Sequence, residues 1–314
     1  MFAVQTLRDL EYDVVVGECV VDHPANDRSV RRRTAELMAM LTDPSIKAVI
    51  PPWGGANAIE VLAMLDFEEV AAAEATWFIG YSDVSTVLTP LTLLTGVTTL
   101  HGNNLMDTPY RVPTSLLPWL DIVTLSAGSE FSQRPAGVHR VNDWDDWTIR
   151  PEVTEHVWNG HGGWRRLDEH RSRIEVTGRM IGGCIETLSA LVGTRFLGVA
   201  DFVEEYAPNG LIVYVESGTG EPARIRQGLE LLRAGGFFAS ANGILVGRTR
   251  SPDPGQSEQV RATLDAIGDL DVPIVGDVEC GHVPPHLPIV NGALGRLCVD
   301  PVDPSSSSLV QTLA

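Results

Sequence analysis

The residues best placed to do chemistry in this sequence are Gly80 to Asp83, which put a hydroxyl directly after the short apolar run Thr76 to Ile79. The run predicts a strand, the glycine permits a tight turn, and the residues from Asp83 onward can begin a helix. Such a turn lifts Ser82 above the sheet edge as a nucleophile and aims the Asp83 N–H at a developing oxyanion. A serine that only caps the helix is the alternative, because the familiar elbow is G-x-S-x-G and position 84 is valine.

A serine nucleophile needs a base, and three of the eight histidines are candidates. His282 lies in the loop Cys280 to Pro285, beyond a predicted strand at Pro273 to Gly276, where glycine and prolines limit its rotamer search. His101 also follows an apolar run and is the main competitor. His286 is too near His282 in the sequence to be dismissed on spacing.

Among the carboxylates, Glu216 stands out because it ends the predicted strand Leu211 to Val215 and opens a glycine-rich turn. A partly desolvated carboxylate there can hold an imidazole in one tautomer and stabilise its charged form. A glutamate satisfied by the N–H groups of its own turn is the alternative. Because the carboxyl ends of parallel strands share one edge, we expect Ser82, Glu216 and His282 to meet at one sheet edge.

The pair Gly54 and Gly55 follows a predicted strand at Ile46 to Ile50. Its bare backbone can supply the second N–H of an oxyanion hole. A structural turn, or a phosphate cradle at a helix N-terminus, would use the same glycines. No lysine or G-x-G-x-x-G fingerprint accompanies them, which disfavours the cradle.

The elements that must position these residues alternate between strands and helices. The predicted strands lie at 13–16, 46–50, 76–79, 211–215, 242–246 and 273–276, and the predicted helices at 1–10, 27–41, 59–65, 184–192, 222–234 and 257–267. This alternation predicts an α/β fold with an amino-terminal parallel-sheet domain of flavodoxin or Rossmann type and a second α/β domain with β-rich parts. We divide the chain into residues 1–110, a tryptophan-rich connecting region at 111–178, and residues 179–314.

Composition excludes several classes of protein. The 314 residues are 44% hydrophobic, enough for a large core, and the formal net charge of −18 argues against nucleic acid or an anionic membrane as a partner. The four cysteines are far apart, so we expect no zinc site and no disulfide framework, and we place the protein in a reducing cytoplasm. No apolar run is long enough to predict a membrane span.

The segment Ile79 to Ser85, with the Gly-Gly loop before it and Leu100-His101-Gly102 after it, resembles the LD-carboxypeptidase family of serine peptidases, which includes the microcin C immunity peptidases. The stretch Arg179 to Thr194, Tyr214 to Glu216 and Gly281-His282 extend this resemblance over nearly the whole chain. It implies a Ser-Glu-His triad at Ser82, Glu216 and His282, and an oxyanion hole from the N–H groups of Gly55 and Asp83. It also implies a two-domain fold, no metal or other cofactor, a cytoplasmic location and a homodimer. His101 then becomes a structural residue.

The sequence departs from this family in two places. Members usually begin with a strand before the helix that resembles residues 1–10, and Cys184-Ile185 stand where relatives commonly have asparagine and leucine.

Within the family, the expected reaction is removal of the terminal D-Ala from a murein tetrapeptide by hydrolysis of an L,D-peptide bond, in cell-wall recycling. The alternative is the immunity-type cleavage of a peptidyl or aminoacyl adenylate, for which Trp147, Trp158 and Trp164 can stack on a base. Such tryptophans more commonly anchor a loop. Gly54 completes the candidate substrate contacts. A binding protein without activity and an ordinary α/β-hydrolase esterase are more remote alternatives, and the esterase predicts the G-x-S-x-G that is missing here.

Overall fold

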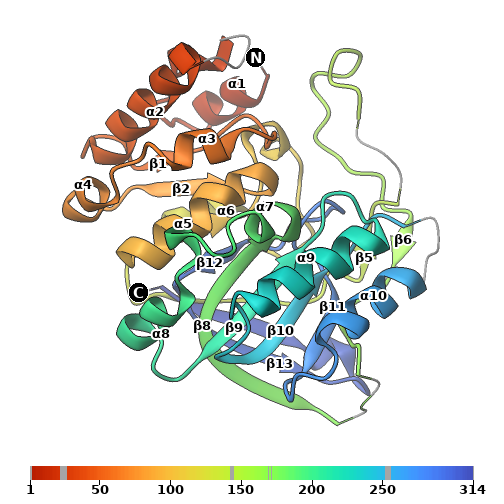
Figure 1. Ribbon diagram of the computed structural model, residues 1–314. Coiled ribbons are helices and arrows are strands. Elements are labelled where there is room, and N and C mark those ends of the chain that lie inside the picture. The colour runs from red at the N-terminus through yellow and green to blue at the C-terminus, as the bar shows by residue number, and fades with distance from the viewer. Residues whose placement is uncertain are drawn as a thin grey trace.

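The computed structural model describes residues 2–21, 27–141, 145–168, 170, 172–251 and 256–313 (Figure 1). The α-helices are α1 (Phe2–Asp9), α2 (Asp27–Thr42), α3 (Ala58–Leu62), α4 (Phe67–Ala72), α5 (Ser85–Thr95), α6 (Trp119–Val123), α7 (Ile185–Ser189), α8 (Val199–Tyr206), α9 (Pro222–Ala234) and α10 (Ser257–Ile267). Short 3-10 helices are η1 (Glu18–Val21), η2 (Ser82–Val84), η3 (Leu105–Asp107), η4 (Arg195–Leu197) and η5 (Pro304–Ser306).

The strands belong to two principal sheets and one small ribbon. They are β1 (Ala48–Val49), β2 (Trp77–Gly80), β3 (Thr99–His101), β4 (Glu130–Gln133), β5 (Val138–His139), β6 (Gly160–His161), β7 (Arg165–Arg166), β8 (Ile174–Cys184), β9 (Leu211–Glu216), β10 (Ala241–Gly247), β11 (Ile274–Val278), β12 (Ile289–Asn291), β13 (Leu294–Val299) and β14 (Ser308–Thr312). The ribbon is the antiparallel pair β5 and β6.

The smaller sheet has four strands in the order β1-β2-β3-β12. β1, β2 and β3 run parallel, whereas β12 comes from the far end of the chain and pairs antiparallel with β3. The parallel part is short and mostly buried, as expected for strands that run between helices. This sheet carries the turn that holds Ser82.

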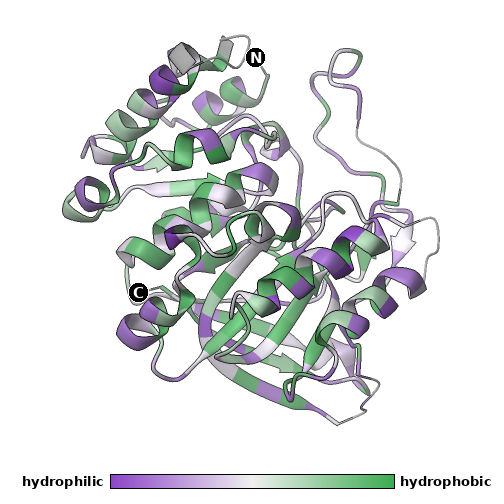
Figure 2. Ribbon diagram, viewed as in Figure 1, coloured by the Kyte–Doolittle hydropathy of each residue, from purple (hydrophilic) through white to green (hydrophobic). Residues whose placement is uncertain are grey.

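The larger sheet has eight strands in the order β4-β14-β13-β8-β9-β10-β11-β7. Its centre, β8 to β11, is parallel, and antiparallel strands flank it on both sides. β9 is buried along its whole length, which explains its unbroken apolar sequence. α9 and α10 lie together over this sheet (Figure 1). Figure 2 shows hydrophobic and hydrophilic residues mixed along both helices, and the buried residues of α9 include Ile225, Leu229 and Leu232.

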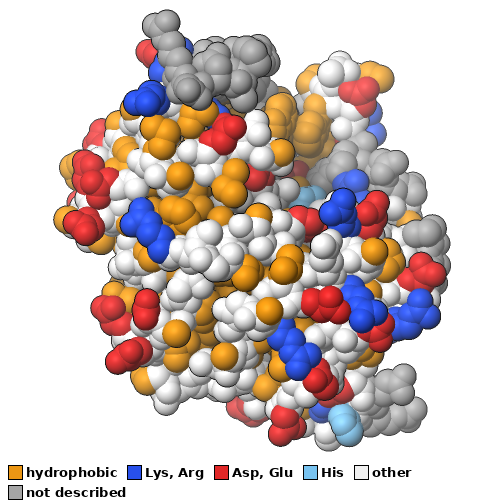
Figure 3. All heavy atoms as spheres, in the orientation of Figure 1, with side chains coloured by type: hydrophobic (Ala, Val, Ile, Leu, Met, Phe, Trp, Pro, Cys, Tyr) orange, Lys and Arg blue, Asp and Glu red, His pale blue; other side chains and the backbone are white. Residues whose placement is uncertain are grey.

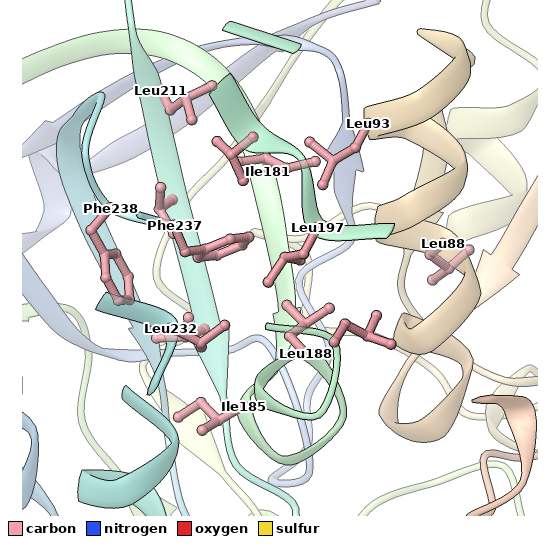
Figure 4. Close-up of a cluster of buried hydrophobic side chains, with 14 of the residues drawn as sticks. Leu88, Leu93, Ile181, Ile185, Leu188, Leu197, Leu211, Leu232, Phe237 and Phe238 are labelled. Atoms are coloured by element: carbon pink, nitrogen blue, oxygen red, sulfur yellow. The ribbon is translucent and has the colours of Figure 1, made fainter. Parts of the chain in front are cut away.

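A shared core joins the two sheets. α5 contributes Leu88 and Leu93 to a buried cluster that also contains Ile181, from β8, and Leu211, from β9 (Figure 4). Apolar surface from both halves of the chain is therefore removed from water in one place.

Polar side chains reinforce this junction. Asn291 Oδ1 accepts hydrogen bonds from the Gly182 N–H (3.2 Å) and the Tyr214 hydroxyl (2.8 Å), and Asn291 Nδ2 donates to Thr99 Oγ1 (3.1 Å). Thr89 donates to the Gly182 carbonyl at 2.6 Å. All these groups are buried, so each bond satisfies atoms that could otherwise find no water.

The predicted α/β class is confirmed, and helices 222–234 and 257–267 have their predicted ends. Residues 13–16 are not a strand in the structure, because the sheet ends at β1 and no described strand lies beyond it to pair with them. The predicted helix 184–192 is shortened to α7: it begins after Cys184 because β8 continues through Gly182 and Gly183 to that residue, and it ends at Ser189, where a turn follows. Residues 59–65 form only α3, and α4 follows separately.

Candidate active site

The turn after β2 holds Ser82 in an unusual backbone conformation. Tyr81 is extended, and Ser82 has a φ of +64°, a region that costs energy for a residue with a side chain. η2 and α5 follow at once. The preceding Gly80 has a φ of +151°, and a Cβ there would lie 2.8 Å from Asn104 Oδ1, so the tight approach needs glycine. The strand, turn and helix expected from the sequence are therefore present around Ser82.

Ser82, His282 and Glu216 form a continuous hydrogen-bonded chain. His282 Nε2 lies 2.9 Å from Ser82 Oγ, and His282 Nδ1 lies 2.7 Å from Glu216 Oε2. The serine and the glutamate thus contact opposite nitrogens of one imidazole. Because an ionised carboxylate only accepts, Nδ1 carries the proton and Nε2 is left to accept from the serine hydroxyl.

The electrostatics of this chain favour a basic imidazole. Glu216 is completely buried, and the His282 side chain is 14% exposed. Burial by itself disfavours a charged ring, but the charge and hydrogen bond of Glu216 outweigh it and raise the pKa of His282 above its ordinary value of 6.5. His282 can therefore take a proton from Ser82 more readily than a free histidine can.

Two glycines leave the room that the imidazole and the carboxylate need. Gly281 has a φ of +114°, and a Cβ there would lie 2.6 Å from Glu216 Oε2. A Cβ on Gly218 would lie 3.2 Å from His282 Nε2. Both glycines border the residues that the sequence analysis selected, which explains the glycine-rich setting of Glu216 and His282.

The Gly54-Gly55 loop lies against the serine turn. A Cβ on Gly54 would lie 2.8 Å from Ser82 Cβ and 3.2 Å from the Asp83 nitrogen. Asp83 Oδ2 accepts a hydrogen bond from the Ala58 N–H at 2.9 Å, which ties the residues after Gly55 to the serine turn. The backbone of both segments therefore borders the Ser82 hydroxyl.

The expectation that the three residues share one sheet edge is wrong. Ser82 follows β2 of the smaller sheet, whereas Glu216 ends β9 of the larger sheet and His282 follows β11 of the larger sheet. The sequence pattern shows that strands alternate with helices but not which sheet each strand joins. The core between the sheets, not a single edge, brings these side chains together.

Sequence reasoning missed the role of Glu186, in the first turn of α7. Its carboxylate accepts from Ser217 Oγ (2.6 Å), Thr219 Oγ1 (3.1 Å) and the Gly218 N–H (3.3 Å). Burial opposes its charge, but these bonds and one from Cys184 Sγ (3.0 Å) lower the pKa of Glu186 below its ordinary value. Glu186 thus fixes the loop that follows Glu216. The sequence feature that could have predicted this role is the position of Glu186 just after Gly182-Gly183. Cys184, which contacts Glu186, is buried.

The other two histidine candidates are also close to this site. His101, at the end of β3, pairs with Gly80, and its Nε2 lies 4.0 Å from Glu216 Oε1. His286 packs on the Tyr81 ring with a centroid separation of 4.4 Å, and the same ring lies 5.0 Å from the His282 ring in an edge-to-face arrangement. Neither ring contacts Ser82 in the structure's hydrogen-bond network. His282 is the histidine that the fold brings to the serine.

Trp147 and Trp158, two of the three tryptophan candidates, belong to an aromatic group beside the Gly54-Gly55 loop. Trp147 is parallel to Trp53, with centroids 6.4 Å apart, and its Nε1 donates to the Tyr110 hydroxyl at 3.2 Å. Tyr110 stacks on His156 at 3.9 Å, and His156 contacts Trp158 at 4.9 Å. Trp53 immediately precedes Gly54 and is 59% exposed. Figure 3 shows hydrophobic side chains facing one another across the hollow between the long loop of the connecting region and the amino-terminal part.

Trp164 lies elsewhere and is buried. Its side chain is 4% exposed, and its Nε1 donates to Glu279 Oε2 at 2.5 Å. Glu279 Oε1 accepts from the Ala136 N–H at 2.9 Å. Trp164 therefore fastens the connecting region to the end of β11, which is the loop-anchor alternative of the sequence analysis.

The fold and the site define a class of protein. An α/β scaffold presents a serine on a strained turn, with an imidazole on its hydroxyl and a buried carboxylate behind the imidazole, which is the arrangement of serine hydrolases. The described residues contain no group of three or more His, Cys, Asp or Glu side chains placed to share a metal ion. In the same part of the chain, every helix is too short or too polar to cross a bilayer.

The family comparison agrees with this class. Residues 1–102 match the LD-carboxypeptidase N-terminal domain, and residues 177–297 match the LD-carboxypeptidase C-terminal domain. The chain belongs to the LD-carboxypeptidase family of serine peptidases and is a hydrolase. The resemblance predicted from the sequence is confirmed.

Individual relatives include a putative carboxypeptidase and a microcin immunity protein. A putative carboxypeptidase of Vibrio cholerae is 23% identical, over 87% of this chain and 78% of its own. The microcin C7 self-immunity protein MccF of Escherichia coli is also 23% identical, over 87% of this chain and 76% of its own. The structure of MccF in complex with aspartyl sulfamoyl adenosine superposes with a TM-score of 0.77 at 18% identity, covering all of this chain and 90% of the other.

Proposed function

We propose that this protein is a serine carboxypeptidase that removes the terminal D-Ala from a murein tetrapeptide by hydrolysing an L,D-peptide bond. The observation that carries the proposal is the chain of hydrogen bonds from Ser82 through His282 to Glu216, in a protein whose two halves both match LD-carboxypeptidase domains. We assign Ser82 as the nucleophile, His282 as the base and Glu216 as the acid that orients the base.

In the first half of the reaction, His282 Nε2 removes the hydroxyl proton as Ser82 Oγ attacks the scissile carbonyl carbon. The tetrahedral oxyanion is stabilised by the N–H groups of Gly55 and Asp83, and the loss of one such donor costs about 3 to 4 kcal/mol of transition-state stabilisation. The imidazolium, stabilised by Glu216, then returns its proton to the leaving amine. An acyl ester on Ser82 remains.

In the second half, His282 removes a proton from water, and the resulting hydroxide attacks the acyl ester. The same two N–H groups stabilise the second oxyanion. The ester bond breaks, the proton on His282 passes to Ser82 Oγ, and the shortened peptide leaves with a new carboxylate. The cycle therefore consumes one water for each amide bond and returns every side chain to its starting state.

A carboxypeptidase also needs a cation for the free carboxylate of its substrate, and Arg250 is suited to this role. Arg250 follows β10, and its backbone lies close enough to Gly220 that a Cβ there would approach the Arg250 carbonyl oxygen to 2.3 Å. The positive charge of Arg250 acts on both Tyr81 and His282, where it favours the lower pKa. The guanidinium thus adds positive potential at these two residues, and we assign to it the attraction of the free carboxylate of the substrate.

One observation favours a second candidate, the hydrolysis of an aminoacyl-nucleotide amide. Trp53 and Trp147 present parallel rings beside the Gly54-Gly55 loop, and a flat base can stack on either ring. Trp158 extends the same aromatic group through His156. A related protein, MccF, has been solved with aspartyl sulfamoyl adenosine. In either case we propose a cytoplasmic enzyme that acts on a small peptide or aminoacyl nucleotide, as a homodimer.

Mass spectrometry of one mixture separates the two candidates. An L,D-tetrapeptide muropeptide and an aminoacyl sulfamoyl adenosine are incubated together with wild-type protein or with Ser82→Ala. Loss of D-Ala that depends on Ser82 supports the carboxypeptidase. Release of sulfamoyl adenosine that depends on Ser82 supports the second candidate, and turnover that persists in Ser82→Ala removes Ser82 from the mechanism.

A further inference from the structure

One oxygen of the central carboxylate has no partner in the chain of hydrogen bonds from Ser82 to Glu216. Glu216 Oε2 contacts His282, but among the described residues Glu216 Oε1 has no hydrogen-bond partner, and neither ring nitrogen of His101 has one. The two unsatisfied groups face each other, with His101 Nε2 4.0 Å from Glu216 Oε1. Their side chains are 1% and 0% exposed, so bulk water does not reach them.

His101 is a neutral donor at neutral pH. Burial lowers its pKa to about 4, more than the nearby carboxylate raises it. A neutral imidazole has one N–H and one acceptor nitrogen, and leaving a buried donor and a buried carboxylate oxygen unpaired is costly. Placing the proton on Nε2 satisfies both groups with one bond, and a shift of about 1 Å brings the 4.0 Å separation to hydrogen-bond distance.

We propose that His101 is a positioning residue that donates its Nε2–H to Glu216 Oε1 and thereby keeps Glu216 Oε2 aimed at His282 Nδ1. The proposal rests on the catalytic roles proposed above for Ser82, His282 and Glu216. It adds a fourth residue that acts on the serine only through the carboxylate and the base.

The surroundings leave Glu216 few other sources of stabilisation. The titratable groups that act on Glu216 or His101 are Tyr81, Cys184, Tyr214, Cys280, His282 and His286. Burial raises the pKa of both tyrosines and both cysteines and lowers the pKa of His286, so these five groups are neutral at pH 7.

Charged groups on other elements also act on the base, His282. Glu186 raises the pKa of His282, and Arg250 lowers it. Asp107 also interacts electrostatically with His282. None of these groups donates to Glu216 Oε1 in the described structure, so His101 is left as the donor that its geometry allows.

The test uses the rate at which a fluorophosphonate probe labels Ser82, because this rate reports the activated serine without a known substrate. In His101→Phe, we expect labelling to slow about 10- to 100-fold, the usual range for a hydrogen bond to a charged group. The less stabilised carboxylate then binds the His282 proton more tightly. The acid limb of the rate-pH profile should therefore move to higher pH.

Two further variants separate positioning from packing. His101→Gln keeps an N–H donor and should recover much of the rate and the wild-type position of the limb. His286→Phe makes the same ring change next to Tyr81, where the described ring makes no hydrogen bond to Glu216 Oε1, and should leave the limb in place. If His101→Phe slows labelling without moving the limb, or if His101→Gln behaves like His101→Phe, the positioning role is overturned.

Nitrogen NMR of the wild-type protein tests the same point without a mutation. The His101 ring should be the neutral Nε2–H tautomer at pH 7, and a proton on Nδ1 instead would overturn the proposal. If the catalytic roles proposed for Ser82, His282 and Glu216 are wrong, the labelling result is different. In that case the probe does not label wild-type Ser82, or labels Ser82→Ala at the same rate, whatever residue stands at position 101.

Discussion

Glu216 and His282 are joined by a 2.7 Å hydrogen bond, although they leave the larger sheet at the ends of different strands, β9 and β11. β10 lies between these two strands, and a Cβ on its last residue, Gly247, would lie 2.8 Å from Glu216 Cβ. The glycine lets the glutamate and the loop of His282 meet across the end of β10. The pKa of His282 is raised because of this contact.

Glu216→Gln should therefore change the pH dependence as well as the rate. Without the carboxylate, burial dominates and lowers the pKa of His282, so the acid limb of kcat/KM should move to lower pH. An amide also favours the wrong tautomer, for which a fall in kcat of about 10⁴-fold is expected. The measurement is a rate-pH profile with Glu230→Gln, an exposed charge removal on α9, as the control. An unmoved limb would contradict the assigned role of Glu216.

Gly54→Ala should damage the site without unfolding the protein. The new methyl group would lie 2.8 Å from Ser82 Cβ, so either the serine or the Gly54-Gly55 loop must move. A displaced oxyanion donor lowers kcat by about 10²- to 10³-fold. Gly198→Ala is the matched control, because its nearest neighbour would be at an ordinary 3.6 Å. We expect similar melting temperatures for both variants, and equal activities would refute the proposed hole.

Trp164→Phe should lower stability more than activity. It removes the indole N–H that donates to the buried Glu279 carboxylate, and an unsatisfied buried acceptor costs about 1 to 3 kcal/mol. Trp147→Ala removes a partly exposed ring, so it should raise KM and change stability little. Urea unfolding and steady-state kinetics of both variants give the comparison. A large rise in KM for Trp164→Phe at unchanged stability would return Trp164 to the substrate contacts.

Asp107→Asn should stabilise the protein at pH 8 but not at pH 4. Burial raises the pKa of Asp107 to about 7 from 3.8. Because the pKa of Asp107 is higher in the folded state than in the unfolded state, its contribution to the free energy of unfolding is fully present below pH 3.8. That contribution is lost as the pH rises toward 7. The loss is of the order of 4 kcal/mol, at about 1.4 kcal/mol per pKa unit. The asparagine keeps an acceptor for the Asn104 N–H.

The measurement for this variant is the free energy of unfolding in urea between pH 4 and pH 8. The wild-type curve should fall across this range relative to that of Asp107→Asn. Parallel curves would show that Asp107 ionises normally in the folded protein.

Local sequence patterns were enough to predict the elements around the site. An apolar run before Gly80 predicts β2 and its turn, and the run before Glu216 predicts β9, because strand and turn preferences act over a few residues. The same patterns selected Ser82, Glu216 and His282. Their residue types and order were readable without any long-range information.

The tertiary structure decided what those patterns could not. Residues 13–16 have the composition of a strand, but a strand exists only where another strand pairs with it, and the sheet ends at β1. The sequence does not distinguish Trp164 from Trp147, but packing buries Trp164 against Glu279 and leaves Trp147 beside Trp53.

The sequence by itself thus determined most of the local elements, the α/β class and the residues that we propose act on a carbonyl. The tertiary structure decided that these residues come from two different sheets, that Glu186 fixes the loop after Glu216, and that His101 faces the free oxygen of Glu216. The physical reason is the separation along the chain over which each kind of interaction acts. Backbone preferences are set by neighbouring residues, whereas burial, pairing and charge interactions depend on residues that lie up to 200 positions apart, as Ser82 and His282 do.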